Sequence, residues 1–400
     1  MLKLQKVIAV VLVGLALVGT VDSASASGRK LKAVDRHSCA HVTAGQVSCL
    51  AIRRTVSMNG IVPHAATPKA LVEPSGHAVF GAKALRKAYG ISAMGIGSKV
   101  IAIVDAHHAG SALADLNGYR TAFGFAAMPA CGNWVQSGCF SQLDVNGQPS
   151  VGDTSDEGWA QETTLDIELA TAMCPNCSIA VVEAATATFS DFNDAVAEAA
   201  SLPGVVAISN SYGGPEVSED SYPAYERAYQ QGIAVVASAG DSGYGVSSPA
   251  SFQNVIAVGG TSLYVNERGN YQSEQAWAGS GSGCARGLAP LWQEPGVTGC
   301  TGKAIADVSA VANPATGVAV LYNGQWLIFG GTSASAPIIA GLLALKHNWG
   351  SSAGQYLWDH RASLRDVSAG ANGTCRKFCK SILGWDGPTG LGSPKGTGAF

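Results

Sequence analysis

Val100-Ile101-Ala102-Ile103-Val104-Asp105 is a run of apolar, mostly β-branched residues that ends on a carboxylate. This stretch belongs to the first of five similar runs. The runs cover Lys99 to Asp105, Ser178 to Glu183, Gly204 to Ser209, Ile233 to Ser238 and Val255 to Gly259. Runs that are apolar throughout suit strands that are buried on both faces. Helix-like segments separate them, among them Glu157 to Met173, Ser190 to Ala200 and Pro223 to Gln231. This alternation predicts an α/β fold with a parallel β-sheet flanked by helices on both faces.

The composition supports a folded protein with a large core. The chain has 400 residues, of which 47% are hydrophobic and 13% are charged, and this length predicts one large domain with a smaller segment. Its 50 glycines follow no triplet period, which indicates tight turns rather than collagen. A net charge of −3, without a basic stripe interleaved with aromatic residues, predicts no nucleic-acid partner.

The N-terminus is typical of a secretory signal peptide. Lys3 and Lys6 precede the apolar run Val7 to Val18, and small residues end in Ala24-Ser25-Ala26, after which we expect cleavage. An uncleaved anchor is the alternative. The apolar run is short for a membrane span and no later stretch is long enough, so we expect secretion to the extracellular space and no stable membrane association.

Three regions follow from these patterns. We expect a signal peptide over residues 1–26, a short pro-segment or N-terminal extension over 27–80 and the main domain over 81–400. Residues Ser27 to Gly76 are mixed and polar, with scattered prolines and no strong period, which is the reason for separating them from the domain.

Ten cysteines fall into five close pairs. Export makes local disulfides the natural prediction, and the pairs are Cys39 with Cys49, Cys131 with Cys139, Cys174 with Cys177, Cys284 with Cys300, and Cys375 with Cys379. The pair Cys174 and Cys177 could instead form a redox motif or half of a zinc site, although no second pair with ligand spacing follows it.

A candidate nucleophile lies in a turn of small residues. Gly330-Gly331-Thr332-Ser333-Ala334-Ser335-Ala336-Pro337 precedes the helical run Ile338 to Leu345, so Ser333 is presented at a helix N-terminus, where positive potential favours developing negative charge. The alternative is an ordinary helix cap with Pro337 in the first turn.

Two carboxylates lie where a base is needed. The chain has no histidine between His108 and His347, whereas Glu162 and Asp166 lie four residues apart within an apolar helix. That spacing puts both on one face of the helix. In a cleft they would share a proton, so that one is ionised and can accept the proton of a serine.

Four motifs in this order resemble the sedolisins, the serine-carboxyl peptidases with a subtilisin-like fold. They are Glu-x-x-x-Asp at Glu162, Ser-x-Ser-Tyr-Gly at Ser209, Gly-Asp-Ser-Gly at Gly240 and Gly-Thr-Ser-x-Ser-x-Pro at Gly331, within a resemblance from about Lys83 to Gly396. The resemblance makes Ser333 the nucleophile, Glu162 the general base and acid, and Asp166 the residue that orients Glu162. Asp241 takes the place of an oxyanion-hole acid, which must be protonated to donate a hydrogen bond.

Further residues take roles from the same resemblance. Ser209 to Gly213 resembles the strand that pairs with extended substrate. Asp105 either extends the carboxylate network to Asp166 or caps a turn. Near the C-terminus the chain resembles the sedolisin calcium site, which implies one structural Ca²⁺ bound by the carboxylates of Asp366 and Asp386 and by the carbonyl oxygens of Val367, Ile382 and Gly384.

The predicted function is that of a secreted, monomeric endopeptidase that acts on proteins or peptides through an acyl-enzyme on Ser333 and favours acidic pH. Tripeptidyl-peptidase specificity and an inactive peptide-binding scaffold are alternatives. A third alternative is a histidine-dependent subtilase that uses His107 or His108 as its base. One feature departs from the family, because sedolisins usually carry a long folded pro-domain and only about fifty residues separate the signal peptide from the first catalytic strands here.

Overall fold

The computed structural model describes residues 31–40, 45–58, 79–131, 138–347, 349–350 and 352–400, and the expected signal peptide lies outside them. Its main sheet has the strand order β12-β11-β9-β7-β4-β6-β5, with β15 beside β11. The strands are β4 Val100–Ala106, β5 Phe140–Asp144, β6 Ser178–Ala184, β7 Val205–Asn210, β9 Ala234–Ser238, β11 Ile256–Val265, β12 Tyr271–Ala276 and β15 Val308–Val311. Their pairings are parallel except that of β11 with β12. The predicted parallel sheet is therefore confirmed.

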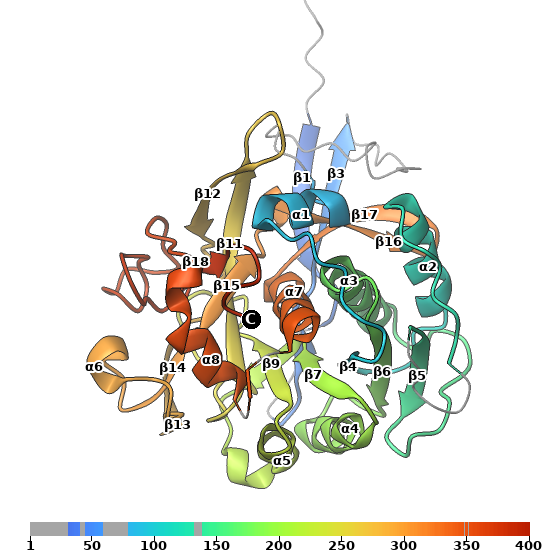
Figure 1. Ribbon diagram of the computed structural model, residues 1–400, viewed down its shortest axis with the longest axis horizontal. Helices are drawn as coiled ribbons and strands as arrows, with labels where there is room; N and C mark the ends of the chain where they lie inside the picture. The colour runs from blue at the N-terminus through green and yellow to red at the C-terminus, as the bar shows by residue number, and fades with distance from the viewer. Residues whose placement is uncertain (1–30, 41–44, 59–78, 132–137, 348, 351) are drawn as a thin grey trace, which may run out of the picture.

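The helices cover both faces of this sheet (Figure 1). They are α1 Ala82–Tyr89, α2 Ala112–Ala122, α3 Glu157–Met173, α4 Phe189–Ser201, α5 Ala224–Gln230, α6 Pro295–Thr298, α7 Thr332–Lys346 and α8 Ala353–Asp359. Strand β4 shows why its sequence is apolar throughout, since Ile101 and Ile103 pack in the cluster of α3 and α7, while Ala102 and Val104 pack in that of α4 and α5. Successive side chains of a strand point to opposite faces, so each face has its own core.

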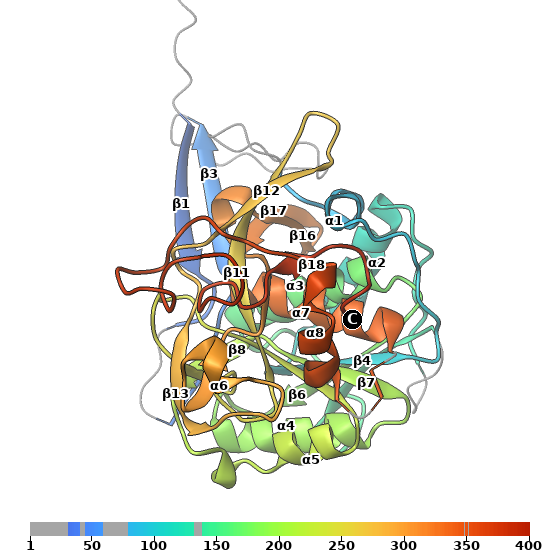
Figure 2. The ribbon, with the colours of Figure 1, turned by 60° about the vertical axis from the view of Figure 1, so that its left-hand side comes forward.

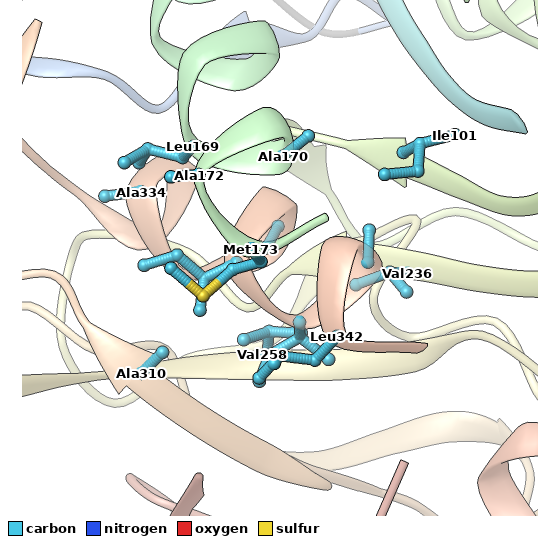
Figure 3. Packing of buried hydrophobic residues seen from close by; sticks show 14 of the residues in the cluster. Ile101, Leu169, Ala170, Ala172, Met173, Val236, Val258, Ala310, Ala334 and Leu342 are labelled. Atoms are coloured by element: carbon cyan, nitrogen blue, oxygen red, sulfur yellow. The ribbon is translucent and has the colours of Figure 1, made fainter. Parts of the chain in front are cut away.

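Helices α3 and α7 pack side by side against the sheet (Figure 3). A Cβ added at Gly341 of α7 would lie 2.8 Å from the Cβ of Met173 and 2.9 Å from the carbonyl oxygen of Ala170, both on α3. The glycine therefore lets the two helices approach closely. This contact fixes the helix that carries Ser333 against the helix that carries Glu162.

Smaller sheets surround the main one. One contains β1 Leu31–His37, β3 Ile52–Met58, β16 Val318–Tyr322 and β17 Gln325–Gly330, and a second contains β2 Ser48–Cys49, β8 Tyr212–Pro215 and β10 Ser247–Ser248. The remaining pairs are β13 Gly283–Leu288 with β14 Gly302–Ile305, and β18 Leu364–Arg365 with β19 Ser393–Pro394. The described part of the N-terminal extension is thus built into two sheets of the main body (Figure 2).

All five expected disulfides form, including Cys174–Cys177. That pair is therefore a staple in this structure rather than a dithiol or half of a zinc site. The described residues contain no cluster of three or more His, Cys, Asp or Glu side chains suited to a metal ion. Within the same residues, every helix is too short or too polar to cross a membrane.

Candidate active site

Ser333 is the second residue of α7 and is fully buried. Its Oγ lies 3.0 Å from Oε2 of Glu162 and 3.1 Å from the carbonyl oxygen of Ser211. Gly331, at the N-cap, has a φ of 93°, which favours glycine. The chain can therefore turn sharply from β17 into α7 and present Ser333 to α3.

Pro337 lies in the second turn of α7, not in the first as the helix-cap alternative assumed. A proline has no N–H, so the carbonyl oxygen of Ser333, four residues earlier, lacks its usual helical donor. The hydroxyl of Ser211 donates to this carbonyl oxygen instead, at 3.5 Å. The carbonyl oxygen that the proline leaves free thus connects the backbone of Ser333 to Ser211, the residue before β8.

Three buried carboxyl groups gather beside Ser333. Glu162 and Asp166 come from one face of α3, and Asp105 comes from the carboxyl end of β4. Burial, followed by the charge of Asp105, raises the pKa of both Glu162 and Asp166 well above the ordinary value. Burial also raises the pKa of Asp105 to about 7. Asp105 is thus close enough for its charge to act on both helix residues, which favours the carboxylate network over the turn cap.

Asp241 follows β9 and points toward the start of α7. Its Oδ1 accepts hydrogen bonds from the backbone N–H and the hydroxyl of Thr332, at 2.8 and 2.7 Å. Its Oδ2 is buried and has no hydrogen-bond partner among the described residues. Burial raises the pKa of Asp241 to about 7 although both bonds from Thr332 lower it. At acidic pH the proton therefore belongs on Oδ2, where it can be donated to a developing oxyanion.

The histidines are engaged elsewhere. Nδ1 of His108 lies 3.0 Å from Oε2 of Glu183, and His107 lines a different pocket, beside Asp156 and Glu157. Among the described residues, the hydroxyl of Ser333 has hydrogen bonds only to Glu162 and the Ser211 carbonyl. The arrangement therefore supports a carboxylate base rather than a histidine base.

Two features of this site are not predicted by the sequence patterns. The first is Thr332, which donates two hydrogen bonds to Asp241 and to which the motif alone gives no role. The second is the contact that the N-terminal extension makes with the site. Leu50 lines a groove of about 320 Å³ together with Gly213 and Asp241. Ala51 donates its N–H to Oε2 of Glu162 at 2.7 Å. Nothing in the polar, aperiodic N-terminal extension indicated that it enters the site.

The expected calcium residues lie together in the C-terminal loops. Oδ2 of Asp366 accepts from the N–H of Gly384 at 2.8 Å, and Oδ2 of Asp386 accepts from the N–H of Ile382 at 3.0 Å. Burial raises the pKa of Asp386 to about 7, and the charge of Asp366 raises it too, although the hydrogen bonds to Asp386 lower it. A cation between the two carboxylates would remove that repulsion, and carboxylate oxygens are donors that Ca²⁺ accepts, so this pair fits the ion.

Known proteins resemble this chain in sequence. Residues 151–367 match the model of the subtilase family. Kumamolisin from Bacillus sp. (strain MN-32) is 35% identical over 277 residues, which are 59% of this chain and 49% of kumamolisin. Sedolisin from Pseudomonas sp. (strain 101) is 33% identical over 195 residues, 44% of this chain and 32% of sedolisin. The chain thus spans about half the length, or less, of these curated relatives.

Solved structures show the same fold. Pseudomonas sedolisin, a serine-carboxyl proteinase in complex with two molecules of pseudo-iodotyrostatin, aligns with a TM-score of 0.67 at 25% identity, over 79% of this chain and 95% of that chain. Sphericase aligns with a TM-score of 0.54 at 18% identity, over 79% of this chain and 97% of its own, and supports the fold alone. With a family model over more than half of its residues, the chain belongs to the subtilase family, and its reported relatives in sequence and structure include sedolisins.

Proposed function

We propose that this chain is a secreted serine-carboxyl endopeptidase that hydrolyses proteins or peptides as a monomer. The observation that carries the proposal is the 3.0 Å hydrogen bond from Oγ of Ser333 to Oε2 of Glu162. A serine hydroxyl becomes a useful nucleophile only when an adjacent group can take its proton. The five disulfides support export to an oxidising compartment.

The reaction runs through an acyl-enzyme. Oγ of Ser333 attacks the scissile carbonyl carbon while Glu162 takes its proton, and the oxyanion receives a hydrogen bond from protonated Asp241. Glu162 then gives the proton to the departing amine. Water, deprotonated by Glu162, hydrolyses the acyl ester and frees Ser333.

The titration of the site confines this activity to acidic pH. Asp241, with its pKa raised to about 7, loses its donated proton as the pH rises through that value. Glu162 works as a base only when ionised, and its raised pKa moves the acidic limit of activity upward. The reaction therefore needs a pH at which the carboxyl cluster has lost a proton while Asp241 keeps its own.

Two variants test this function. Ser333→Ala removes the nucleophile, and Glu162→Gln keeps the size of the base but removes its proton-accepting charge. Each should lower kcat by at least about a thousandfold, measured with peptide substrates from acidic to mildly alkaline pH. The conservative exposed change Asp194→Asn is the control. A wild type that is most active above neutrality, or a Glu162→Gln enzyme of full activity, would sink the proposal.

We also propose that the C-terminal loops bind one structural calcium ion. Asp366 and Asp386 would supply the carboxylates, and Val367, Ile382 and Gly384 the carbonyl oxygens. The ion would supply positive charge that neutralises the two carboxylates and ties the loops together. It takes no part in the peptidase steps.

A further inference from the structure

The loop that carries Asp241 forms one wall of the groove at the candidate active site. This wall loop, residues 239–246, connects β9 to β10, and most of its residues line the groove of about 320 Å³. Its three glycines, Gly240, Gly243 and Gly245, all have a positive φ. A glycine-rich loop loses much conformational entropy when it is fixed in one shape. The position of Asp241 therefore depends on the contacts that hold this loop from outside.

A support segment, residues 279–282, holds the wall loop through its backbone. Hydrogen bonds of 2.8 to 3.1 Å between backbone atoms join Gly281 with Gly240, Gly279 with Gly243 and, in both directions, Ser282 with Gly245. A Cβ added at Gly281 would lie 1.9 Å from the carbonyl oxygen of Ala239 and 2.5 Å from its carbonyl carbon. The two backbones are thus in direct contact on both sides of Asp241, so a shift of the support segment shifts the wall loop.

Asn372, in the C-terminal loops, is buried against the support segment and is only 8% exposed. Its Nδ2 donates to the carbonyl oxygen of Ser280 at 2.6 Å and to the hydroxyl oxygen of Ser282 at 2.7 Å. A carbonyl oxygen can only accept, and the hydroxyl of Ser282 donates its own hydrogen to the carbonyl oxygen of Phe378 at 2.6 Å. The atom between these two acceptors must therefore be the amide nitrogen, which has two hydrogens to donate.

The backbone of Asn372 is fixed at its N–H and at its carbonyl oxygen. The N–H donates to the carbonyl oxygen of Cys379 at 2.9 Å, in the loop that the disulfide of Cys375 and Cys379 closes. The carbonyl oxygen accepts from the N–H of Tyr244, in the wall loop, at 3.3 Å. A Cβ added at Gly243 would lie 2.8 Å from the same oxygen. Asn372 therefore contacts both the wall loop and the segment that supports it.

The remaining polar atom of Asn372 gains nothing from this position. Its Oδ1 is buried and has no hydrogen-bond partner among the residues that the structure describes. A buried acceptor without a partner destabilises a fold, and such an atom in a folded protein calls for an explanation. The two hydrogen bonds that Nδ2 donates to the support segment supply one, because no apolar side chain could make them.

We propose that Asn372 is a positioning residue for the reaction at Ser333, because its grip on the support segment keeps Asp241 where Oδ2 can donate to the oxyanion. The inference rests on the proposed peptidase function. Asn372 acts through the wall loop and not by touching the substrate. Without its side chain the support segment is free to shift, and Asp241 moves away from the oxyanion and toward water. A misplacement of about 1 Å can lower a rate on the order of a hundredfold.

The first experiment compares Asn372→Ala with the wild type in the exported full chain. The kcat for peptide hydrolysis should fall on the order of tenfold or more, with a smaller change in KM, because Asp241 acts on the oxyanion rather than on bound substrate. The alkaline limb of the pH profile should also move to lower pH, since burial holds the pKa of Asp241 at about 7 and a less buried carboxyl group titrates lower. Asn270→Ala, at an exposed asparagine between β11 and β12, is the matched control and should leave both unchanged.

The second experiment measures the oxyanion site without turnover. A peptide aldehyde adds the hydroxyl of Ser333 across its C=O bond, so that Oγ is bonded to the carbon and the aldehyde oxygen lies beside Asp241, whereas the matching peptide alcohol only binds. The wild type should bind the aldehyde more tightly, and Asn372→Ala should reduce the ratio of the two affinities on the order of tenfold. Ser282→Ala removes one of the two acceptors of Asn372 and should reduce the ratio in the same direction.

The outcomes separate this inference from the proposed function. An Asn372→Ala enzyme with a lowered Tm but with the wild-type pH profile and affinity ratio would show that Asn372 only stabilises the fold, and the peptidase function would stand. If that variant does not fold, a folded Ser282→Ala enzyme with the wild-type ratio would equally contradict the inference. A wild type that hydrolyses no peptide and binds the aldehyde no better than the alcohol would overturn the proposed function itself.

Discussion

Asp241 shows how burial changes the work that a carboxyl group can do. In water it would be ionised at acidic pH and would repel an oxyanion, but burial raises its pKa to about 7. Thr332 occupies Oδ1 with two donated hydrogen bonds, which leaves Oδ2 for the proton. In the proposed mechanism the same chemical group therefore serves as a donor at Asp241 and as a base at Glu162, where the serine hydroxyl donates to it.

A substitution at this residue tests the role. Asp241→Ala should lower kcat by on the order of a hundredfold or more, because the oxyanion loses its donor. Asp241→Asn keeps an N–H that can donate and does not titrate, so its loss should be smaller. Its activity should also no longer fall as the pH rises through about 7. The measurement is the pH profile of kcat for both variants, and an Asn variant with the wild-type alkaline limb would contradict the assignment.

At the scale of elements, the site depends on the contact between α3 and α7. Glu162 lies on α3 and Ser333 on α7, so any change in the spacing of these helices changes the 3.0 Å bond between the two side chains. Gly341 allows that spacing, since an added Cβ would lie within 3.0 Å of the Cβ of Met173 and of the carbonyl oxygen of Ala170 on α3. Packing of this kind is rigid and transmits strain to the site.

Gly341→Ala should therefore reduce both stability and activity. Overpacking at a helix contact costs about 1–3 kcal/mol in the free energy of unfolding, and the displaced helix should lower kcat more than it raises KM. Gly296→Ala is the matched control, since an added Cβ there has no atom within 4 Å. Denaturant unfolding and steady-state kinetics measure the two effects. A variant with unchanged stability would show that the helices can separate freely.

The buried acids make the free energy of unfolding of the whole molecule depend on pH. Asp105 and Asp241 have a pKa of about 7 in the fold against an ordinary value of 3.8. Between those values the folded chain binds more protons than the unfolded chain. Stability is thus fully present below the ordinary value and is lost as the pH rises through about 7. The free energy of unfolding should fall by about 1.4 kcal/mol per pH unit for each group over this range.

Thermal unfolding of the Ser333→Ala chain, which cannot cleave itself, measures this dependence without autolysis. The Tm should fall as the pH rises from about 4 to about 7. Adding Asp241→Asn should make the fall shallower, because one titrating group is removed. A Tm that rises over the same interval would contradict the assigned direction of these shifts.

Calcium should stabilise the molecule as a whole. Removing it with a chelator should lower the Tm of the Ser333→Ala chain by about 5 °C, since a ligand present well above its Kd adds roughly 2–3 kcal/mol. Asp386→Asn should abolish the difference between chelated and calcium-loaded protein, while Asp194→Asn should keep it. Equal Tm values for the wild-type loops with and without calcium would overturn the proposed site.

The sequence by itself determined the elements and the order of the motifs. Apolar β-branched runs predicted β4 and its neighbours, because a strand buried on both faces admits little else. The predicted helix over Glu157 to Met173 begins and ends at those residues in the structure. The disulfides were predicted too, since each joins cysteines that are close along the chain.

Only the tertiary structure decided which of these pieces meet. The role of Asp105 in the carboxyl cluster, the hold of Thr332 on Asp241 and the entry of the N-terminal extension into the site depend on contacts between distant parts of the chain. Ala51 and Glu162 are 111 residues apart, and no periodicity or spacing links two such positions. The pKa values follow the same rule, because burial shifts them and burial is a property of the packed molecule.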